Sequence, residues 1–337
     1  MNQNNITIAI DAMGGDNSPY KCLKGAEIFT NKIHNIKLIL LGDRNIIEQN
    51  IEKNKIQISN YEIIHLTNNI KNDDTANTIL RNRKDSSIYR GLEIVKNNQL
   101  SGFVSSGNTA AIMILSRLIL GMIKGIDRPA ICSLIPNKKG YSIMLDLGAN
   151  VSSDANDLFQ FSLMGYCYHS ILKKNIDPKI GIINIGTENN KGKEFLQEAS
   201  EMINKSFLKK FFIGFIEPNK MTSGECDIII TDGYTGNIIL KTAEGMSKYI
   251  TGSLKNVFIK SLMNKLAYSI LKNDLNNFKD KINPAKYDGA MLLGVNGVSI
   301  KSHGYSSPFA FSCAIERCYE FIKNELNKKI SKQINEQ

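Results

Sequence analysis

The chain has 337 residues, of which 42% are hydrophobic and 22% charged, so it is long enough for one large or two closely joined α/β domains. It contains no run of 18 apolar residues and no basic, apolar leader, so we expect neither a membrane-spanning helix nor a signal peptide. The net charge of +10 suits an anionic partner, but no block of Lys and Arg is interleaved with aromatic residues, so we expect no nucleic-acid binding.

The first half of the chain alternates short apolar runs with polar loops. The β-branched run at 6–10 predicts a buried strand, which ends in a loop that contains Asp11, Gly14, Gly15 and Asp16. Further strands are predicted at 37–41, 61–66 and 102–104, and helices at 46–53 and 88–97. Ligands of open α/β sheets bind at the carboxyl ends of strands, so the loop after the first strand is a candidate site.

A polar turn at 105–109 joins the strand at 102–104 to an apolar helix. The first N–H groups of a helix lack intrahelical partners and the helix dipole is positive there, so an anion can bind. Gly107 allows close approach of the backbone, and Ser106, Asn108 and Thr109 add side-chain donors. Taken alone, such a turn is more typical of an ordinary helix cap, but similar turns elsewhere in the chain favour a phosphate site.

The second half of the chain repeats this scheme. Strands are predicted at 141–145, 179–184, 211–216, 227–231, 290–294 and 298–300, and helices at 154–172, 194–205, 238–249 and 309–323. The polar turns between them contain Asp146, Asn150, Asn184, Gly186, Thr187, Asp232, Gly233, Thr235, Gly236, Asn237, Lys301, Ser302, His303 and Gly304. The alternation predicts one α/β domain over 1–337, a doubly wound, Rossmann-like αβα sandwich with a mostly parallel central sheet.

The polar turns are expected to lie along one edge of that sheet, in a cleft that handles phosphate. No turn matches GxxxxGK[ST], and none matches GxGxxG with an acidic residue about twenty positions further on, so the sequence predicts no nucleotide cofactor. The six cysteines form no CxxC pair and the four histidines no HxxxH or HExxH spacing. We therefore expect reduced thiols, a cytoplasmic location and no metal site.

An amphipathic helical element at 254–278 is expected to protrude from the domain. Apolar residues at helical spacing form one stripe over 254–275, and lysines flank it. A basic amphipathic helix can lie on an anionic membrane or pack on an acidic partner, and such stripes are also typical of core or dimer helices. The sequence leaves these readings open.

Taken together, the motifs resemble the phosphate acyltransferase (PlsX) family of bacterial phospholipid synthesis over nearly the whole chain. They are IAIDAMGGD at 8–16, SGNT at 106–109, DRPA at 127–130, LDLGAN at 145–150, NIG at 184–186, DGYTGN at 232–237, GVNGV at 294–298 and KSHG at 301–304. The chain departs from the family at Ser105-Ser106, where a small residue such as Ala is usual, and at Asp288-Gly289, where Gly-Gly is usual.

The resemblance implies transfer of a fatty acyl group from acyl carrier protein to inorganic phosphate. The acyl phosphate would then serve a membrane glycerol-3-phosphate acyltransferase. It further implies a homodimer with an αβα sandwich that needs no cofactor or metal and associates with the inner face of the membrane.

Residue roles are assigned here from the turns themselves. Asn108, Lys301, His303, Asn184 and Asp232 are the candidate catalytic residues, and the other polar-turn residues are expected to bind phosphate and substrate. The N–H groups at 107–109, with Lys301 and His303, would bind phosphate, and Asn184, Thr187, Asp232 and Asn237 would line the acyl-thioester side.

Two alternatives compete with this reading. The first is a metal- and nicotinamide-dependent dehydrogenase, for which Asp11, Asp16, Asp146 and Asp232 would supply an acidic cluster. The second is a non-catalytic scaffold that docks lipid enzymes at the membrane through 254–275.

Overall fold

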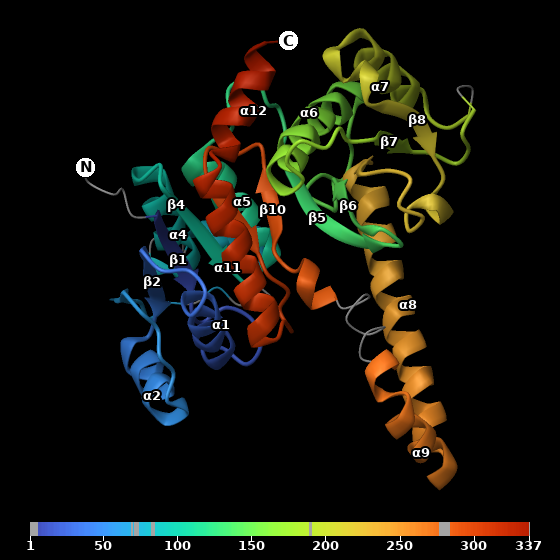
Figure 1. The fold of residues 1–337 in the computed structure, drawn as a ribbon. Helices are drawn as coiled ribbons and strands as arrows, with labels where there is room; N and C mark the ends of the chain where they lie inside the picture. Colours follow the sequence, from blue (N-terminus) through green and yellow to red (C-terminus); the bar gives the residue numbers. More distant parts are fainter. Residues whose placement is uncertain are drawn as a thin grey trace.

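The computed structural model describes residues 6–336 except 69, 71–73, 82–84, 189–190 and 276–283. An eleven-stranded sheet with the order β3-β2-β1-β4-β11-β10-β5-β6-β9-β7-β8 runs through the described part of the chain (Figure 1). Its strands are β1 (Ile6–Asp11), β2 (Ile36–Gly42), β3 (Tyr61–His65), β4 (Ser101–Ser105), β5 (Ala130–Asn137), β6 (Gly140–Leu145), β7 (Ile180–Ile183), β8 (Phe212–Ile216), β9 (Ile228–Ile230), β10 (Ala290–Leu293) and β11 (Val298–Lys301). Each strand predicted from the sequence is present, and β5 is an addition.

Helices cover both faces of the sheet, which confirms the predicted αβα sandwich. They are α1 (Tyr20–Thr30), α2 (Arg44–Asn54), α3 (Ala76–Arg81), α4 (Ser87–Asn97), α5 (Thr109–Leu120), α6 (Ala155–Leu172), α7 (Glu194–Lys205), α8 (Gly233–Ile259), α9 (Leu262–Ile270), α11 (Pro308–Lys323) and α12 (Leu326–Asn335). The helices α1, α3 and α12 have no counterpart in the sequence predictions.

The strands β1, β2, β3, β4 and β11 run parallel and form the first half of the sheet. Successive residues of β1 point to opposite faces, so Ile8 packs in the same core as Phe311 of α11, while Ala9 packs with Leu92 of α4. Helices α1 and α11 pack on each other over one face, and α4 packs beside α5 over the other. The ends of β1, β4 and β11 therefore lie side by side.

The strands β6, β9, β7 and β8 form a second parallel group. Phe161 of α6 and Ile203 of α7 lie in the core that also holds Ile180 of β7 and Ile228 of β9. On the opposite face, Ile239 of α8 packs against a core around Ile229 of β9. The start of α8 is thereby held against the second half of the sheet.

The strand directions contradict the expectation that all polar turns share one edge. β11 pairs antiparallel with β10, β10 with β5, and β5 with β6, so the direction reverses three times between the two parallel groups. The carboxyl ends of β6, β9 and β7 therefore lie on the edge opposite to those of β1, β4 and β11. The alternation of strands and helices in the sequence does not reveal these antiparallel pairs, because the hydrophobic pattern of a strand does not indicate its direction in the sheet.

The predicted single helix at 254–275 is also wrong. α8 continues from Gly233 through Ile259, and a new helix, α9, begins at Leu262 after a cap in which Ser261 Oγ accepts the Asn264 N–H at 3.1 Å. The two helices contact each other and form a hairpin, α8–α9, which projects from the sandwich (Figure 1). Residues 276–278 of the predicted protrusion lie outside the described residues.

Candidate functional site

Three turns at the carboxyl ends of β1, β4 and β11 meet in a group that we call the cationic cluster. It consists of the turns 11–16, 105–109 and 301–304 together with Lys21. The backbone N–H of Ser302 donates to the Ser105 carbonyl at 2.9 Å, and the Asp16 N–H donates to the Gly304 carbonyl at 3.0 Å. The structure therefore brings Asp11, Gly14, Gly15, Asp16, Ser106, Gly107, Asn108, Thr109, Lys301, Ser302, His303 and Gly304 together, as the sequence predicts.

Asp11 organises the contact between the first two turns. Its buried carboxylate accepts the Ser105 hydroxyl at 2.6 Å, and that hydroxyl accepts the Gly107 N–H at 2.9 Å. Burial raises the pKa of Asp11. A Cβ added at Gly14 would lie only 2.8 Å from the Gly107 nitrogen, so the loop after β1 packs closely against the start of α5.

Lys21 of α1 lies inside the cluster, although sequence reasoning missed it. Its side chain is 1% exposed, and its ammonium donates to the Gly304 carbonyl at 2.8 Å. A Cβ added at Gly15, whose φ is +75°, would lie 2.8 Å from Lys21 Nζ and 2.7 Å from the Ser106 carbonyl oxygen. A single Lys in an amphipathic helix is usually solvated, so only the contact with a turn 283 residues further on identifies it.

Burial makes both lysines of the cluster easy to deprotonate. It lowers the pKa of Lys301 to about 8, and it lowers the pKa of Lys21 as well. Lys301 Nζ also donates to the Ser302 carbonyl within its own turn. At neutral pH Lys301 thus remains mostly protonated, and the nearby carboxylates of Asp288 and Asp11 only partly offset the effect of burial on its pKa.

The lowered pKa of His303 favours a neutral ring near pH 7. Partial desolvation lowers the pKa of His303 below its ordinary value, which favours the neutral ring. Its Nδ1 accepts the backbone N–H of Tyr305 at 3.3 Å, so the proton of the neutral ring is assigned to Nε2. The positive charge of the cationic cluster therefore comes from Lys301 and Lys21.

The helix α8 passes near the cluster from the second half of the molecule. Lys241 and Glu244, two and three turns into α8, are among the charges that act on His303: Glu244 raises the pKa of His303 and Lys241 lowers it. α8 begins at the opposite edge of the sheet, and its rise of about 1.5 Å per residue carries it past the sheet to the cluster.

A second group of polar residues lies at the start of α8, where the ends of β6 and β9 meet. The buried Asp146 carboxylate accepts five hydrogen bonds, from the N–H groups of Ile131, Gly148, Ala149 and Asn150 and from the Asn150 amide. A Cβ added at Gly233 would lie 2.4 Å from Asp146 Oδ2, and one at Gly236 would overlap the Asp146 carbonyl. This packing explains why the DGYTGN motif needs glycines at both positions.

Two of the candidate catalytic residues hold their own loops. Asp232 caps α8 and accepts the Thr235 N–H at 2.9 Å and the Thr235 hydroxyl at 2.7 Å. The Asn184 amide donates to the Lys191 carbonyl at 2.9 Å, which closes the loop that contains Gly186 and the exposed Thr187. The structure places Asn184, Gly186, Thr187 and 232–237 at the second edge, so it does not bring them to the cationic cluster.

The geometry also separates the acidic residues that a metal-dependent dehydrogenase would need. Asp11 and Asp16 lie at the first edge of the sheet, and Asp146 and Asp232 at the second. Among the described residues, no three or more His, Cys, Asp or Glu side chains are grouped so that they could hold a metal ion. No helix in the described part of the chain is long and apolar enough to cross a membrane.

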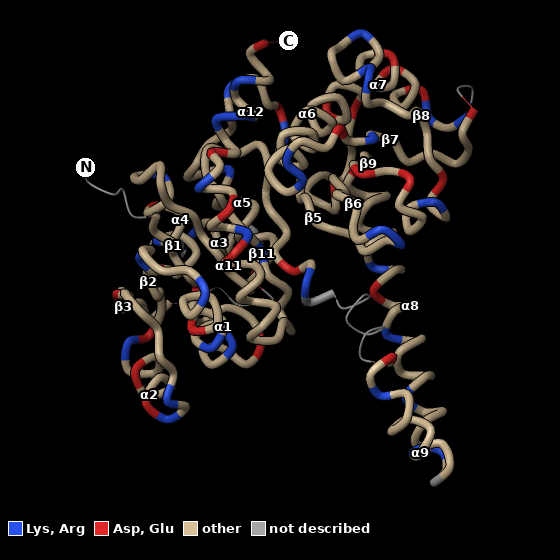
Figure 2. Tube along the Cα trace, viewed as in Figure 1, with Lys and Arg blue, Asp and Glu red and all other residues tan. Residues whose placement is uncertain are grey.

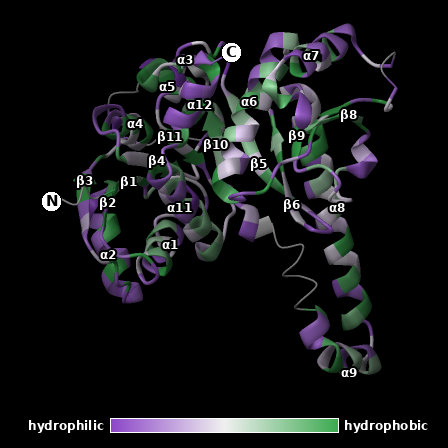
Figure 3. Cartoon of the chain, turned by 45° about the horizontal axis from the view of Figure 1, so that its top comes forward, coloured by the Kyte–Doolittle hydropathy of each residue, from purple (hydrophilic) through white to green (hydrophobic). Residues whose placement is uncertain are grey.

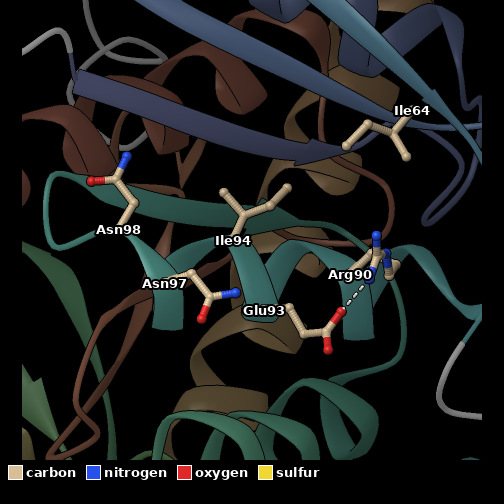
Figure 4. A pocket seen from close by; sticks show the side chains of 6 residues that line it. All are labelled: Ile64, Arg90, Glu93, Ile94, Asn97 and Asn98. Atoms are coloured by element: carbon tan, nitrogen blue, oxygen red, sulfur yellow. Dashed lines mark hydrogen bonds and ion pairs between the residues drawn. The ribbon is translucent and has the colours of Figure 1, made fainter.

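A hollow of about 340 Å³ lies elsewhere, between β3 and α4 (Figure 4). Its lining consists of Ile64, Arg90, Glu93, Ile94, Asn97 and Asn98. Arg90 is paired with Glu93 at 2.6 Å, and none of the candidate residues from the sequence lines this hollow.

Comparisons with known proteins agree with these observations. The fatty acid synthesis protein family matches residues 6–329. A phosphate acyltransferase of a Wolbachia from Brugia malayi is 40% identical over 99% of this chain and 98% of its own, and one of Rhodospirillum rubrum is 36% identical over 98% and 95%.

Solved structures share the fold at low sequence identity. A phosphotransacetylase from Streptococcus pyogenes superposes with a TM-score of 0.65 at 17% identity, and covers 95% of both chains. A branched-chain phosphotransacylase from Enterococcus faecalis gives a TM-score of 0.56 at 10% identity, over 94% of this chain and 99% of its own. The chain therefore belongs to the fatty acid synthesis protein family, and it is an acyltransferase.

Proposed function

We propose that this acyltransferase moves a fatty acyl group from a thioester to inorganic phosphate, at the cationic cluster. The observation that supports this most directly is the meeting of Lys301, Lys21 and the start of α5 at one sheet edge. Two cations and the N–H groups of a helix start are the donors that a phosphate dianion requires. The names of the relatives, which are phosphate acyltransferases, support the same acceptor.

Phosphate needs positioning more than activation, because it is already an anionic nucleophile at neutral pH. In the proposed reaction a phosphate oxygen forms a bond to the thioester carbonyl carbon. The Nε2–H of His303 donates to the oxyanion, while Lys301 and N–H groups at the start of α5 hold the phosphate. The C–S bond then breaks, and the thiolate leaves with the electron pair and takes up a proton.

The acyl-thioester is proposed to lie along α8, between the two polar groups. Tyr234, Ile238 and Lys241 are spaced by four and three residues and so share one face of the helix. Tyr234 is 62% exposed and Ile238 is 47% exposed, which leaves apolar surface for an acyl chain or its carrier arm. An acyl-thioester bound along this face of α8 would extend from Asn237 and Thr187 at one end to His303 at the other.

The donor is proposed to be acyl carrier protein, and the product acyl phosphate for phospholipid synthesis. The net charge of +10 favours an acidic protein partner. An acyl phosphate is labile in water, so its consumer, a membrane glycerol-3-phosphate acyltransferase, is best placed close to its source. The enzyme is therefore proposed to work in the cytoplasm, at the inner face of the membrane.

The α8–α9 hairpin is the proposed membrane or dimer element. Tyr249, Val257, Met263, Leu266 and Ile270 are between 56% and 82% exposed along it. Charged positions are interspersed with uncharged ones along the hairpin (Figure 2), and hydrophilic positions with hydrophobic ones (Figure 3). One apolar face can enter an anionic bilayer surface while lysines contact the headgroups, or it can pack on a second copy of this chain. A scaffold without activity would leave the cationic cluster without a role.

The proposed function is tested with acyl carrier protein loaded with palmitate. The protein is incubated with this thioester with and without inorganic phosphate, and release of the carrier thiol is measured. Phosphate-dependent release together with formation of acyl phosphate is expected. Thiol release that is indifferent to phosphate, or a nicotinamide-dependent signal with Mg²⁺, would refute the proposal.

A further inference from the structure

Asp288 lies next to the cationic cluster, although neither the sequence motifs nor the proposed reaction uses it. Its Oδ1 accepts the His303 N–H at 3.0 Å and the Gly289 N–H at 2.8 Å, and its Oδ2 accepts the Ser302 hydroxyl at 2.6 Å. One carboxylate thus fixes two successive residues of the turn 301–304. The Ser302 N–H in turn bonds to Ser105, so the same turn is tied to the start of α5.

Arg317 of α11 holds the backbone on both sides of Asp288. Its guanidinium is largely buried and donates to the carbonyls of Tyr287 at 3.1 Å and Gly289 at 3.3 Å. Gly289 has a φ of +96°, and a Cβ there would lie 2.9 Å from the Ala314 backbone of α11. The planar fork of Arg317 and the close packing of Gly289 hold the backbone on both sides of Asp288, whose carboxylate bonds to the turn 301–304.

The charge of Asp288 also acts on the cations of the cluster. Asp288 is the largest of the charges that oppose the lowered pKa of Lys301, and Asp11 acts in the same direction. Lys21 of α1 and Lys241 of α8 act in the opposite direction. Burial has a larger effect than any of these charges and lowers the pKa of Lys301 to about 8. Asp288 limits this decrease, so Lys301 keeps its proton at neutral pH.

We infer that Asp288 is a positioning residue that shapes the turn 301–304 for phosphate, and that Arg317 aims Asp288 at this turn. This inference rests on the proposed function, because it assigns phosphate to the cationic cluster. It predicts that phosphate binding depends on a residue that itself carries a negative charge. If Asp288 only repelled phosphate, removal of its charge would strengthen phosphate binding instead of weakening it.

The test is calorimetric titration of the full-length protein with inorganic phosphate between pH 6.5 and 9. Asp288→Asn keeps the size of the side chain and removes its charge. We expect the pH at which phosphate binding is lost to fall by about one unit, as the removal of a nearby opposite charge does. At pH 7.5 this shift corresponds to roughly threefold weaker binding.

Two further variants make the test specific. Arg317→Lys keeps the charge on α11 but removes the fork, so the shift should have the same direction and be smaller. Glu316→Gln removes one negative charge from the same helix, where its carboxylate lies 3.9 Å from Lys32 Nζ, and should leave the profile unchanged. Thermal unfolding of each variant confirms that it is folded.

Each result decides between the readings. A midpoint that stays in place in folded Asp288→Asn, or tighter phosphate binding, would overturn the inference and leave the proposed function intact. A wild-type protein that binds no phosphate while it still releases carrier thiol would instead refute the phosphate-dependent reaction itself, and the inference with it.

Discussion

At the scale of single residues, the desolvated charge of Lys301 lowers the stability of the folded protein. Its pKa of about 8 lies below the value of about 10.4 of an unfolded lysine, so between these values the unfolded chain binds more protons than the folded one. Deprotonation of Lys301 therefore increases the free energy of unfolding as the pH rises through that window. At neutral pH Lys301 is protonated in the folded state, so its desolvated charge destabilises the fold by nearly the full amount.

Lys301→Met should separate the two effects. The variant loses the charge that is proposed to hold phosphate, so its phosphate Michaelis constant should rise and lose its dependence on pH around 8. The buried charge disappears as well, so the variant should be at least as stable as the wild type in urea at pH 7. A variant that is destabilised and keeps its Michaelis constant would make Lys301 a structural residue.

Gly15 tests how closely the turns of the cluster must approach each other. In Gly15→Ala the new Cβ would lie 2.7 Å from the Ser106 carbonyl oxygen, in a backbone conformation with φ of +75°. We expect a loss of activity and a loss of stability greater than the roughly 1–3 kcal/mol of backbone strain alone.

Gly214→Ala is the matched control for Gly15→Ala. Gly214 has a φ of +87°, but a Cβ there would meet nothing within 4 Å, so this variant carries the strain without the crowding. The two variants are compared by urea unfolding and by phosphate-dependent acyl release. Equal losses in both would show that the turns tolerate a wider spacing.

At the scale of elements, α5 depends on its cap, and its first turn is proposed to bind phosphate. The Asn108 side chain accepts the Ala111 N–H at 3.0 Å, so Asn108→Ala should lower the free energy of unfolding by about 1 kcal/mol. If the same turn binds the reacting phosphate, the turnover rate should fall by roughly a hundred- to a thousandfold.

A cap on another helix provides the comparison for Asn108. The Asp43 side chain caps α2 by accepting the N–H groups of Asn45 and Ile46, and Asp43 belongs to none of the turns of the cationic cluster. Asp43→Ala should lower stability by a similar amount and leave the turnover rate unchanged. If both variants lose activity in proportion to stability, Asn108 is only a cap.

The α8–α9 hairpin should decide where the protein works. Met263 is 76% exposed and Ile270 is 82% exposed, so a double change of both to Glu should abolish sedimentation with anionic vesicles while acyl transfer in solution continues. Ile176→Glu, at a loop residue that is 57% exposed, should leave sedimentation intact. A double variant that sediments normally but becomes monomeric would assign the hairpin to the dimer.

At the scale of the whole molecule, sequence reasoning found the elements better than their directions. The runs around Ile8 and Val104 are β-branched or apolar and end at glycine turns, so strands and anion-binding turns were predictable. The hairpin at Ser261 and the cluster role of Lys21 were not, because both depend on contacts between segments. Nor could the opposite placement of Asp232 and Lys301 be predicted, since it follows from three antiparallel pairings.

The place of β10 and β11 in the sheet has a consequence for synthesis. These strands come from the last fifth of the chain, yet they lie between β4 and β5, which emerge from the ribosome much earlier. Until residues 290–301 appear, the nascent protein consists of two unfinished sheets with bare hydrogen-bonding edges, which invite pairing with other chains.

Refolding should therefore be slow, and the centre of the sheet should form last. In pulse-labelling hydrogen exchange, the amides of β4 should gain protection in the same phase as those of β10, and later than those of β2. A chain that stops after Tyr287 should aggregate, because β4 and β5 have no other strand to join them. Soluble, compact folding of that shortened chain would mean that the two halves are independent and that the last strands only dock onto them.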